Sequence, residues 1–115
     1  MARLLLCSLA VLVAACSKGP DADLQYIKQA RSVAAEWALV NEQAGKGALT
    51  ATYVASMHEW LRDQLQTSSQ SLTRPDSRYG EEIRALLQQP DDAAPDELRA
   101  HVDKLKQIED SLESA

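Results

Sequence analysis

The chain has 115 residues, which is enough for one small domain. Its 17 acidic residues outnumber its 12 basic residues, so the formal net charge is −5 at pH 7. This balance argues against binding to nucleic acid and against purely electrostatic adhesion to an anionic membrane. We therefore expect no nucleic-acid partner.

An apolar segment lies near the start of the sequence. Residues 4–16 are apolar except for Ser8, and Arg3 places a positive charge before them. A helix that crosses a bilayer needs about 20 apolar residues. This segment is shorter and has the length of the hydrophobic part of an export signal. It ends on the letters VAAC, Val13 to Cys16, in which two small alanines precede a cysteine.

The VAAC motif resembles the lipobox of bacterial lipoproteins. The resemblance implies that residues 1–15 are a signal peptide that is removed, that the Cys16 sulfur receives a diacylglyceryl group, and that its new amino group is acylated. Two or more acyl chains hold a protein stably on a bilayer. In this class, a serine such as Ser17 after the cysteine favours the outer membrane over the inner one, so we expect a cell-envelope protein that faces the periplasm. The alternative is an ordinary secretory signal in which Cys16 has no role.

Lipidation would leave the chain without a free thiol. Cys7 lies in the removed segment and Cys16 becomes a thioether, so neither serves a disulfide, a metal site or catalysis. Residues 16–22 are then the lipidated cysteine and a short polar linker. Because residues 17–22 reach about 20 Å at most, we expect the domain of residues 23–115 to lie close to the membrane.

The first helix is predicted from about Asp23 to Ala44. One side of it is polar and follows the three- and four-residue spacing of a helix, although Leu39 lies on the same side. Because the centres of protein interfaces avoid charge, this nearly uncharged side is where we expect contact if the bundle docks a partner through a helix face. The predicted contact stripe consists of Gln25, Gln29, Ser32, Glu36, Leu39 and Gln43. Gly45 and Gly47 then predict the turn of a helix hairpin.

Two further helices follow this turn. Thr50 or Thr52 is predicted to cap the second helix, whose apolar positions again recur at spacings of three and four. Its last residues, 67–71, are all polar, and we expect them to fray. Asp76 or Ser77 is predicted to cap a short third helix.

Prolines mark the limits of the remaining segments. Pro90 ends the third helix, and Pro95 fits the first position of the last helix, where Asp96 and Glu97 favour the helix dipole. Amphipathic helices bury their apolar stripes only by packing together. The predicted fold is therefore all-α, a small up-and-down bundle of three long helices and one short helix.

The sequence contains no complete catalytic or metal-binding motif, although some residues match part of one. The letters HEWLR, His58 to Arg62, begin like the helix of a zinc protease, but Arg62 stands where the second ligand belongs. We interpret His58 as a surface residue. His101 lies on an apolar stripe, and we expect Glu97, one turn earlier, to be its partner. We predict no metal site, no cofactor and no enzymatic activity.

An acidic patch precedes and begins the last helix. It lacks the alternating oxygen ligands and the central glycine of a calcium loop, so we interpret it as helix capping and dipole compensation. The patch consists of Asp91, Asp92, Asp96 and Glu97.

Two tryptophans complete the candidate residues. Trp37 and Trp60 fall on the apolar sides of two helices joined by a tight turn, so we expect them to pack against each other in the core. The predicted function is a lipid-anchored, non-catalytic interaction or accessory module with a protein partner in the envelope. The alternative is a periplasmic protein that binds a small ligand between the aromatic residues of the first two helices.

Overall fold

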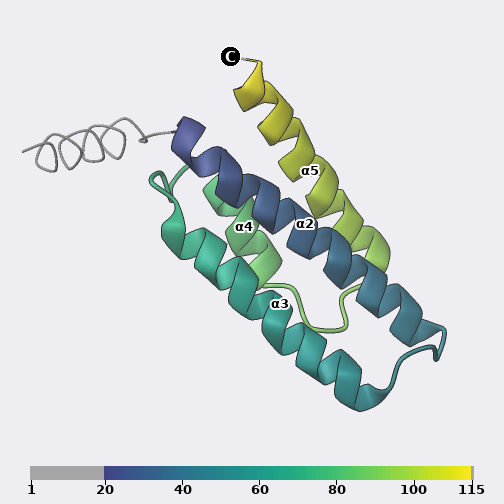
Figure 1. The fold of residues 1–115 in the computed structure, drawn as a ribbon. Coiled ribbons are helices and arrows are strands. Elements are labelled where there is room, and N and C mark those ends of the chain that lie inside the picture. Colours follow the sequence, from purple (N-terminus) through teal and green to yellow (C-terminus); the bar gives the residue numbers. More distant parts are fainter. Residues whose placement is uncertain (1–19, 115) are drawn as a thin grey trace, which may run out of the picture.

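The computed structural model describes residues 20–114, and within them it contains four α-helices and no strand (Figure 1). The helices are α2 (Pro20–Gly45), α3 (Ala51–Ser71), α4 (Arg78–Leu87) and α5 (Pro95–Glu113). The all-α prediction of three long helices and one short helix is confirmed. The predicted signal peptide and Cys16 lie outside the described residues.

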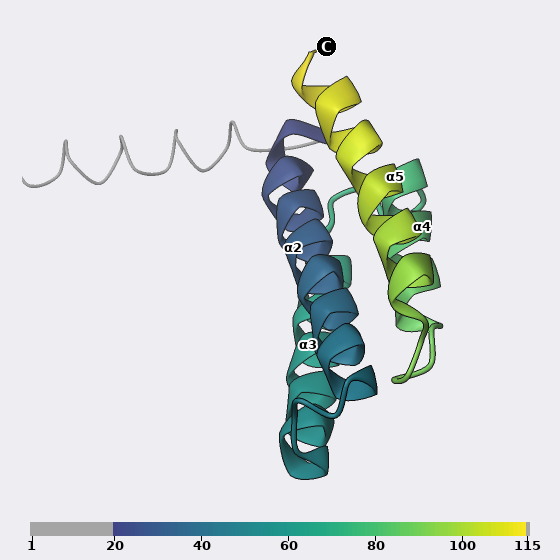
Figure 2. The same cartoon turned by 90° about the vertical axis from the view of Figure 1, so that its right-hand side faces the viewer.

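Each helix runs antiparallel to the one before it, as in an up-and-down bundle. Helix α2 packs along both α3 and α5, while α4 lies between α3 and α5 (Figure 1). Seen from the side, α2 and α3 form one layer, and α4 and α5 form the other (Figure 2). The α2–α3 layer therefore has one face turned away from α4 and α5.

Ion pairs join the antiparallel helices α2 and α5 along their length. Near the start of α2, Lys28 Nζ lies 2.8 Å from Glu113 Oε1 at the end of α5. Next along α2, the guanidinium of Arg31 donates to both carboxylate oxygens of the buried Glu109, at 2.7 and 3.4 Å. A further pair, between Glu42 and Arg99, joins the end of α2 to the start of α5.

The core lies between the two layers. Every helix contributes apolar side chains at spacings of three and four, so each apolar stripe faces its neighbours. Small alanines on α2 allow α3 and α5 to approach it closely. The side chains with almost no exposed surface include Ile27, Ala30, Trp37, Leu61, Leu65, Ile83, Leu86, Leu98 and Leu105.

The helix boundaries follow local rules. Thr50 Oγ1 accepts a hydrogen bond from the Tyr53 amide, and Ser77 Oγ accepts one from the Gly80 amide, so Thr50 and Ser77 are the caps. Pro95 is at the start of α5, as predicted. Helix α2 begins at Pro20, three residues earlier than the predicted start, because proline is accepted in the first turn, where its missing N–H needs no partner.

The polar end of α3 was expected to fray, but the structure shows it as helix. Residues 67–71 are helical to Ser71, and Ser68 within them is fully buried. The segment is held because Leu72 and Thr73, which follow it, pack and hydrogen-bond onto the bundle. None of the helices described between residues 20 and 114 is both long and apolar enough to cross a bilayer.

Candidate functional site

The predicted contact stripe lies on the outward side of α2. Gln25, Ser32, Glu36 and Leu39 are exposed, and the exposed fraction of Leu39 is 53%. The remaining two residues of the stripe, Gln29 and Gln43, are half-buried. The structure therefore places all six residues along one side of a single helix.

This stripe continues onto α3. The Gln29 side-chain amide donates to Gln64 Oε1 at 3.1 Å, so Gln64 lies at the seam between the two helices. Trp60 is one helical turn before Gln64 and Tyr53 is two further turns back, which places both on the same side of α3. Their exposed fractions are 48% and 49%. We call the stripe together with Tyr53, Trp60 and Gln64 the α2–α3 face.

The α2–α3 face combines exposed apolar groups with little charge. Leu39, Tyr53 and Trp60 are the exposed large hydrophobic residues of the described chain, and all three belong to this face. Glu36 is its one charged member. Sequence analysis found the α2 half of the face but missed the α3 half, because Trp60 was expected in the core.

The expected packing of Trp37 against Trp60 is wrong. Trp37 is 1% exposed, whereas Trp60 is 48% exposed. The inner positions of α3 are taken by Leu61 and Leu65, and a residue directly before Leu61 is turned by about 100° around the helix. The two tryptophans therefore do not line a shared cavity.

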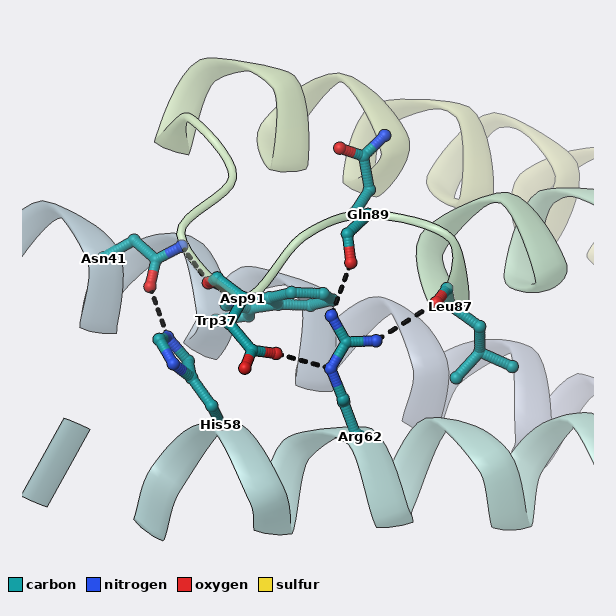
Figure 3. Close-up of polar contacts among 7 residues, drawn as sticks. All are labelled: Trp37, Asn41, His58, Arg62, Leu87, Gln89 and Asp91. Atoms are coloured by element: carbon teal, nitrogen blue, oxygen red, sulfur yellow. Dashed lines mark hydrogen bonds and ion pairs between the residues drawn. The ribbon is translucent and has the colours of Figure 1, made fainter. Parts of the chain in front are cut away.

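Trp37 instead lies at the centre of a polar cluster between both layers (Figure 3). Its indole Nε1 donates to the Asp91 carbonyl oxygen at 2.9 Å. The Arg62 guanidinium carbon lies 5.1 Å from the centroid of the Trp37 ring, which is a cation–π arrangement. The indole is thus held between the loop before α5 and an arginine of α3.

Arg62 fastens the α4–α5 loop to α3. Its Nε donates to Asp91 Oδ1 at 2.5 Å, one terminal nitrogen donates to the Leu87 carbonyl at 3.1 Å, and the other donates to the Gln89 carbonyl (Figure 3). Such a planar fork of donors is particular to arginine. Arg62, which stands where the zinc-protease pattern has its second histidine, therefore positions the α4–α5 loop.

Asn41 and His58 extend the cluster. Asn41 Nδ2 donates to the carbonyl oxygens of Asp91 and Ala93, at 3.0 and 2.8 Å. Its Oδ1 is therefore left to accept, and it lies 2.7 Å from His58 Nε2, which must carry the proton. His58 is half-buried and bonded, so its interpretation as a plain surface residue is wrong.

The predicted partner of His101 is also wrong. His101 Nδ1 lies 2.5 Å from Glu82 Oε1 on α4, and its Nε2 lies 3.2 Å from the side-chain nitrogen of Gln89. Glu97 is exposed. The ring turns toward α4, where Glu82 is nearly as buried as the histidine, rather than along its own helix.

The interpretation of the acidic patch as helix capping is wrong, because the N-cap residue of α5 is Ala94 and no side chain accepts a capping hydrogen bond there. Asp91 pairs with Arg62, while Asp96 and Glu97 lie in the first turn of α5, where they oppose the helix dipole as predicted. Within the described part of the chain, no group of three or more His, Cys, Asp and Glu side chains is arranged to hold a metal ion.

Sequence reasoning missed the cluster around Trp37. The available signal was the four-residue spacing of Trp37 and Asn41 on one helix and of His58 and Arg62 on the next, which places each pair on one helix side. Their shared partner, Asp91, comes from a loop whose path depends on tertiary packing. Comparison with protein-family models, with curated proteins and with solved structures gave no match to this chain.

Proposed function

We propose that this protein is a lipid-anchored lipoprotein of the bacterial cell envelope that acts as a non-catalytic interaction module. The VAAC motif supports the anchor on Cys16, and Ser17 supports the outer membrane with the domain facing the periplasm. The α2–α3 face supports contact with a protein partner.

The observation that carries the interaction role is the composition of the α2–α3 face. Isolated exposed leucines are ordinary on protein surfaces. Here three large apolar residues share one low-charge side of a chain in which 25% of the residues are charged. Aromatic residues are enriched in interfaces, while charged ones are depleted. Trp60 and Tyr53 are the residue types that most often dominate binding energy.

Site-specific photocrosslinking in cells that make the full chain tests this role. A photoreactive residue at position 39 or 60 should give a discrete crosslinked product of larger mass. The matched control is position 107, because Gln107 is exposed on α5, away from the face. Absence of a product from both face positions, or the same products from all three positions, would contradict the proposal.

A pair of substitutions extends this test. Leu39→Glu combined with Trp60→Glu should abolish the crosslinked product formed from position 53, because both changes place charge on the docking surface. Both side chains are about half exposed, so the folded bundle should persist and give an unchanged helical circular dichroism spectrum. Gln107→Glu serves as the charge control and should leave the product intact.

A further inference from the structure

A second surface feature lies between α3 and α4, on the other side of α3 from Trp60. It is a groove with a volume of about 470 Å³, within the range of small-molecule sites. Two arginines, three glutamines and a serine supply its polar lining: Arg62, Gln66, Ser69, Gln70, Arg84 and Gln88. No carboxylate lines this groove, although the chain has 17 acidic residues.

Arg62, whose charge is paired with Asp91, offers this groove preorganised hydrogen-bond donors. Three of its five N–H groups are used by the Leu87 and Gln89 carbonyls and by Asp91, which leaves two N–H groups for a ligand. These three hydrogen bonds and the cation–π contact with Trp37 hold the guanidinium in place. A group that is already immobilised loses little entropy on binding.

Arg84 supplies the unpaired cation of this groove from the facing helix. One of its N–H groups donates to the Pro75 carbonyl at 2.5 Å, and four remain. Arg84 is exposed and has no carboxylate partner among residues 20–114. Arginine is suited to bidentate hydrogen bonds with the oxygens of a carboxylate or phosphate.

The glutamines add neutral hydrogen-bonding groups. The side-chain amides of Gln66, Gln70 and Gln88 make no hydrogen bond within the described part of the chain, and all three are exposed. Each amide offers two donors and one acceptor oxygen, which matches hydroxyl groups, because a hydroxyl both donates and accepts.

We propose that the α3–α4 groove binds a hydroxylated anion of sugar size, such as a sugar acid or a sugar phosphate. Arg84 takes the anionic group, while the glutamines and the two remaining N–H groups of Arg62 take the hydroxyls. This site requires neither the lipid anchor nor the α2–α3 face, since Arg62 and Trp60 are two residues apart on α3 and therefore lie about 200° apart around the helix.

Isothermal titration of the full chain, purified in detergent, tests the proposal with glucuronate, glucose 6-phosphate and uncharged glucose as probes. At least one of the two anions should bind saturably, and glucose should bind at least tenfold more weakly. Which anion binds tells a sugar acid from a sugar phosphate. Failure of both anions to bind the folded wild type, or equal binding of glucose, would overturn the proposal.

Matched variants locate the site. Gln66→Glu places a carboxylate in the groove at an exposed position and should weaken anion binding at least tenfold. Gln107→Glu makes the same change of net charge on the outer side of α5 and should leave the affinity within twofold. Arg84→Gln should also weaken binding at least tenfold. Equal affinity of Gln66→Glu and Gln107→Glu would exclude this groove as the site.

Discussion

A buried carboxylate determines how the start of α2 is held. Asp23 has no exposed surface, and its carboxylate accepts hydrogen bonds from the Tyr79 hydroxyl at 2.6 Å, the Thr73 amide at 2.8 Å, the Thr73 hydroxyl at 3.0 Å and the Arg74 amide at 3.2 Å. Burial by itself raises the pKa of Asp23. The hydrogen bonds from Tyr79, Thr73 and Arg74 together outweigh burial, so the pKa lies below its usual value of 3.8.

This lowered pKa predicts the pH dependence of stability. Asp23 stabilises the fold fully above its unfolded pKa near 3.8, and the contribution is lost as the pH falls below that value toward the folded pKa. Asp23→Asn should lower the free energy of unfolding at pH 7 by about 2 kcal/mol, since hydrogen bonds to a charged group are lost. Urea unfolding at pH 7 and pH 3 measures both effects, and the variant should show a smaller acid loss than the wild type.

Asp21→Asn is the control for this prediction. Asp21 is exposed in the first turn of the same helix, so its replacement should change stability little and should keep the acid dependence of the wild type. An acid loss in Asp23→Asn as large as in the wild type would show that Asp23 is not the group responsible.

Arg62 is the second residue with a specific prediction. Arg62→Lys keeps the charge but loses the planar fork that reaches Asp91 and two carbonyls, so the free energy of unfolding should fall by about 1–3 kcal/mol. Urea denaturation measures the change. Arg99→Lys is the matched control, because Arg99 is about half exposed and its pairing with Glu42 contributes little. Equal losses in the two variants would contradict the positioning role of Arg62.

The turn between α3 and α4 passes so close to α4 that position 80 requires glycine. A Cβ atom built on Gly80 would lie 2.2 Å from the Pro75 carbonyl oxygen, which is backbone and does not move freely. Glycine at this position therefore allows the turn to pass directly against the first turn of α4, where Ser77 caps the Gly80 amide.

Gly80→Ala should therefore destabilise the protein, by about 1–3 kcal/mol, because the added methyl group overpacks the turn. Gly45→Ala is the control at the end of α2, where an added Cβ meets nothing within 4 Å. It should be neutral or should stabilise the helix by about 0.5–1 kcal/mol. Thermal unfolding followed by circular dichroism measures both, and a Gly80→Ala variant as stable as Gly45→Ala would rule out the close contact.

The elements were predictable from the sequence because their signals are local. Thr50, Ser77 and Pro95 act through their own helix ends, and the three- and four-residue spacing marks the buried sides. The position of Trp60 and the pairing of His101 with Glu82 were not predictable in this way. Both depend on how each helix is rotated about its axis relative to its neighbours, and a rotation of one residue, about 100°, moves a side chain from the core to the surface.

At the scale of the whole molecule, the candidate surfaces are distributed around a closed core. The bundle has two layers (Figure 2) and buries its apolar stripes between α2, α3, α4 and α5. Leu39, Tyr53 and Trp60 of the α2–α3 face are exposed outside this core. The predicted contact stripe on α2 could be found from the sequence because low charge and an exposed leucine are visible in one helix. The groove could not be found in this way, because its lining comes from two helices and its arginines are positioned by backbone carbonyls distant in the sequence.

The proposed anchor places constraints on this bundle. Helix α2 begins at Pro20, four residues after Cys16, so the helix starts within about 14 Å of the proposed lipidated sulfur. A partner of the α2–α3 face would then lie beside the bundle and near the same membrane. The proposed location of the bundle and of its partner thus depends on the covalent lipid on Cys16.

Intact mass spectrometry of the processed protein, with labelled palmitate fed to the cells and Cys16→Ala beside the wild type, tests this claim most directly. We expect the wild-type chain to begin at Cys16, to carry the added mass of acyl chains and to incorporate the label. We expect the Cys16→Ala chain to carry no acyl mass and no label. A processed wild-type chain that begins at another residue, or that carries no lipid mass, would contradict it.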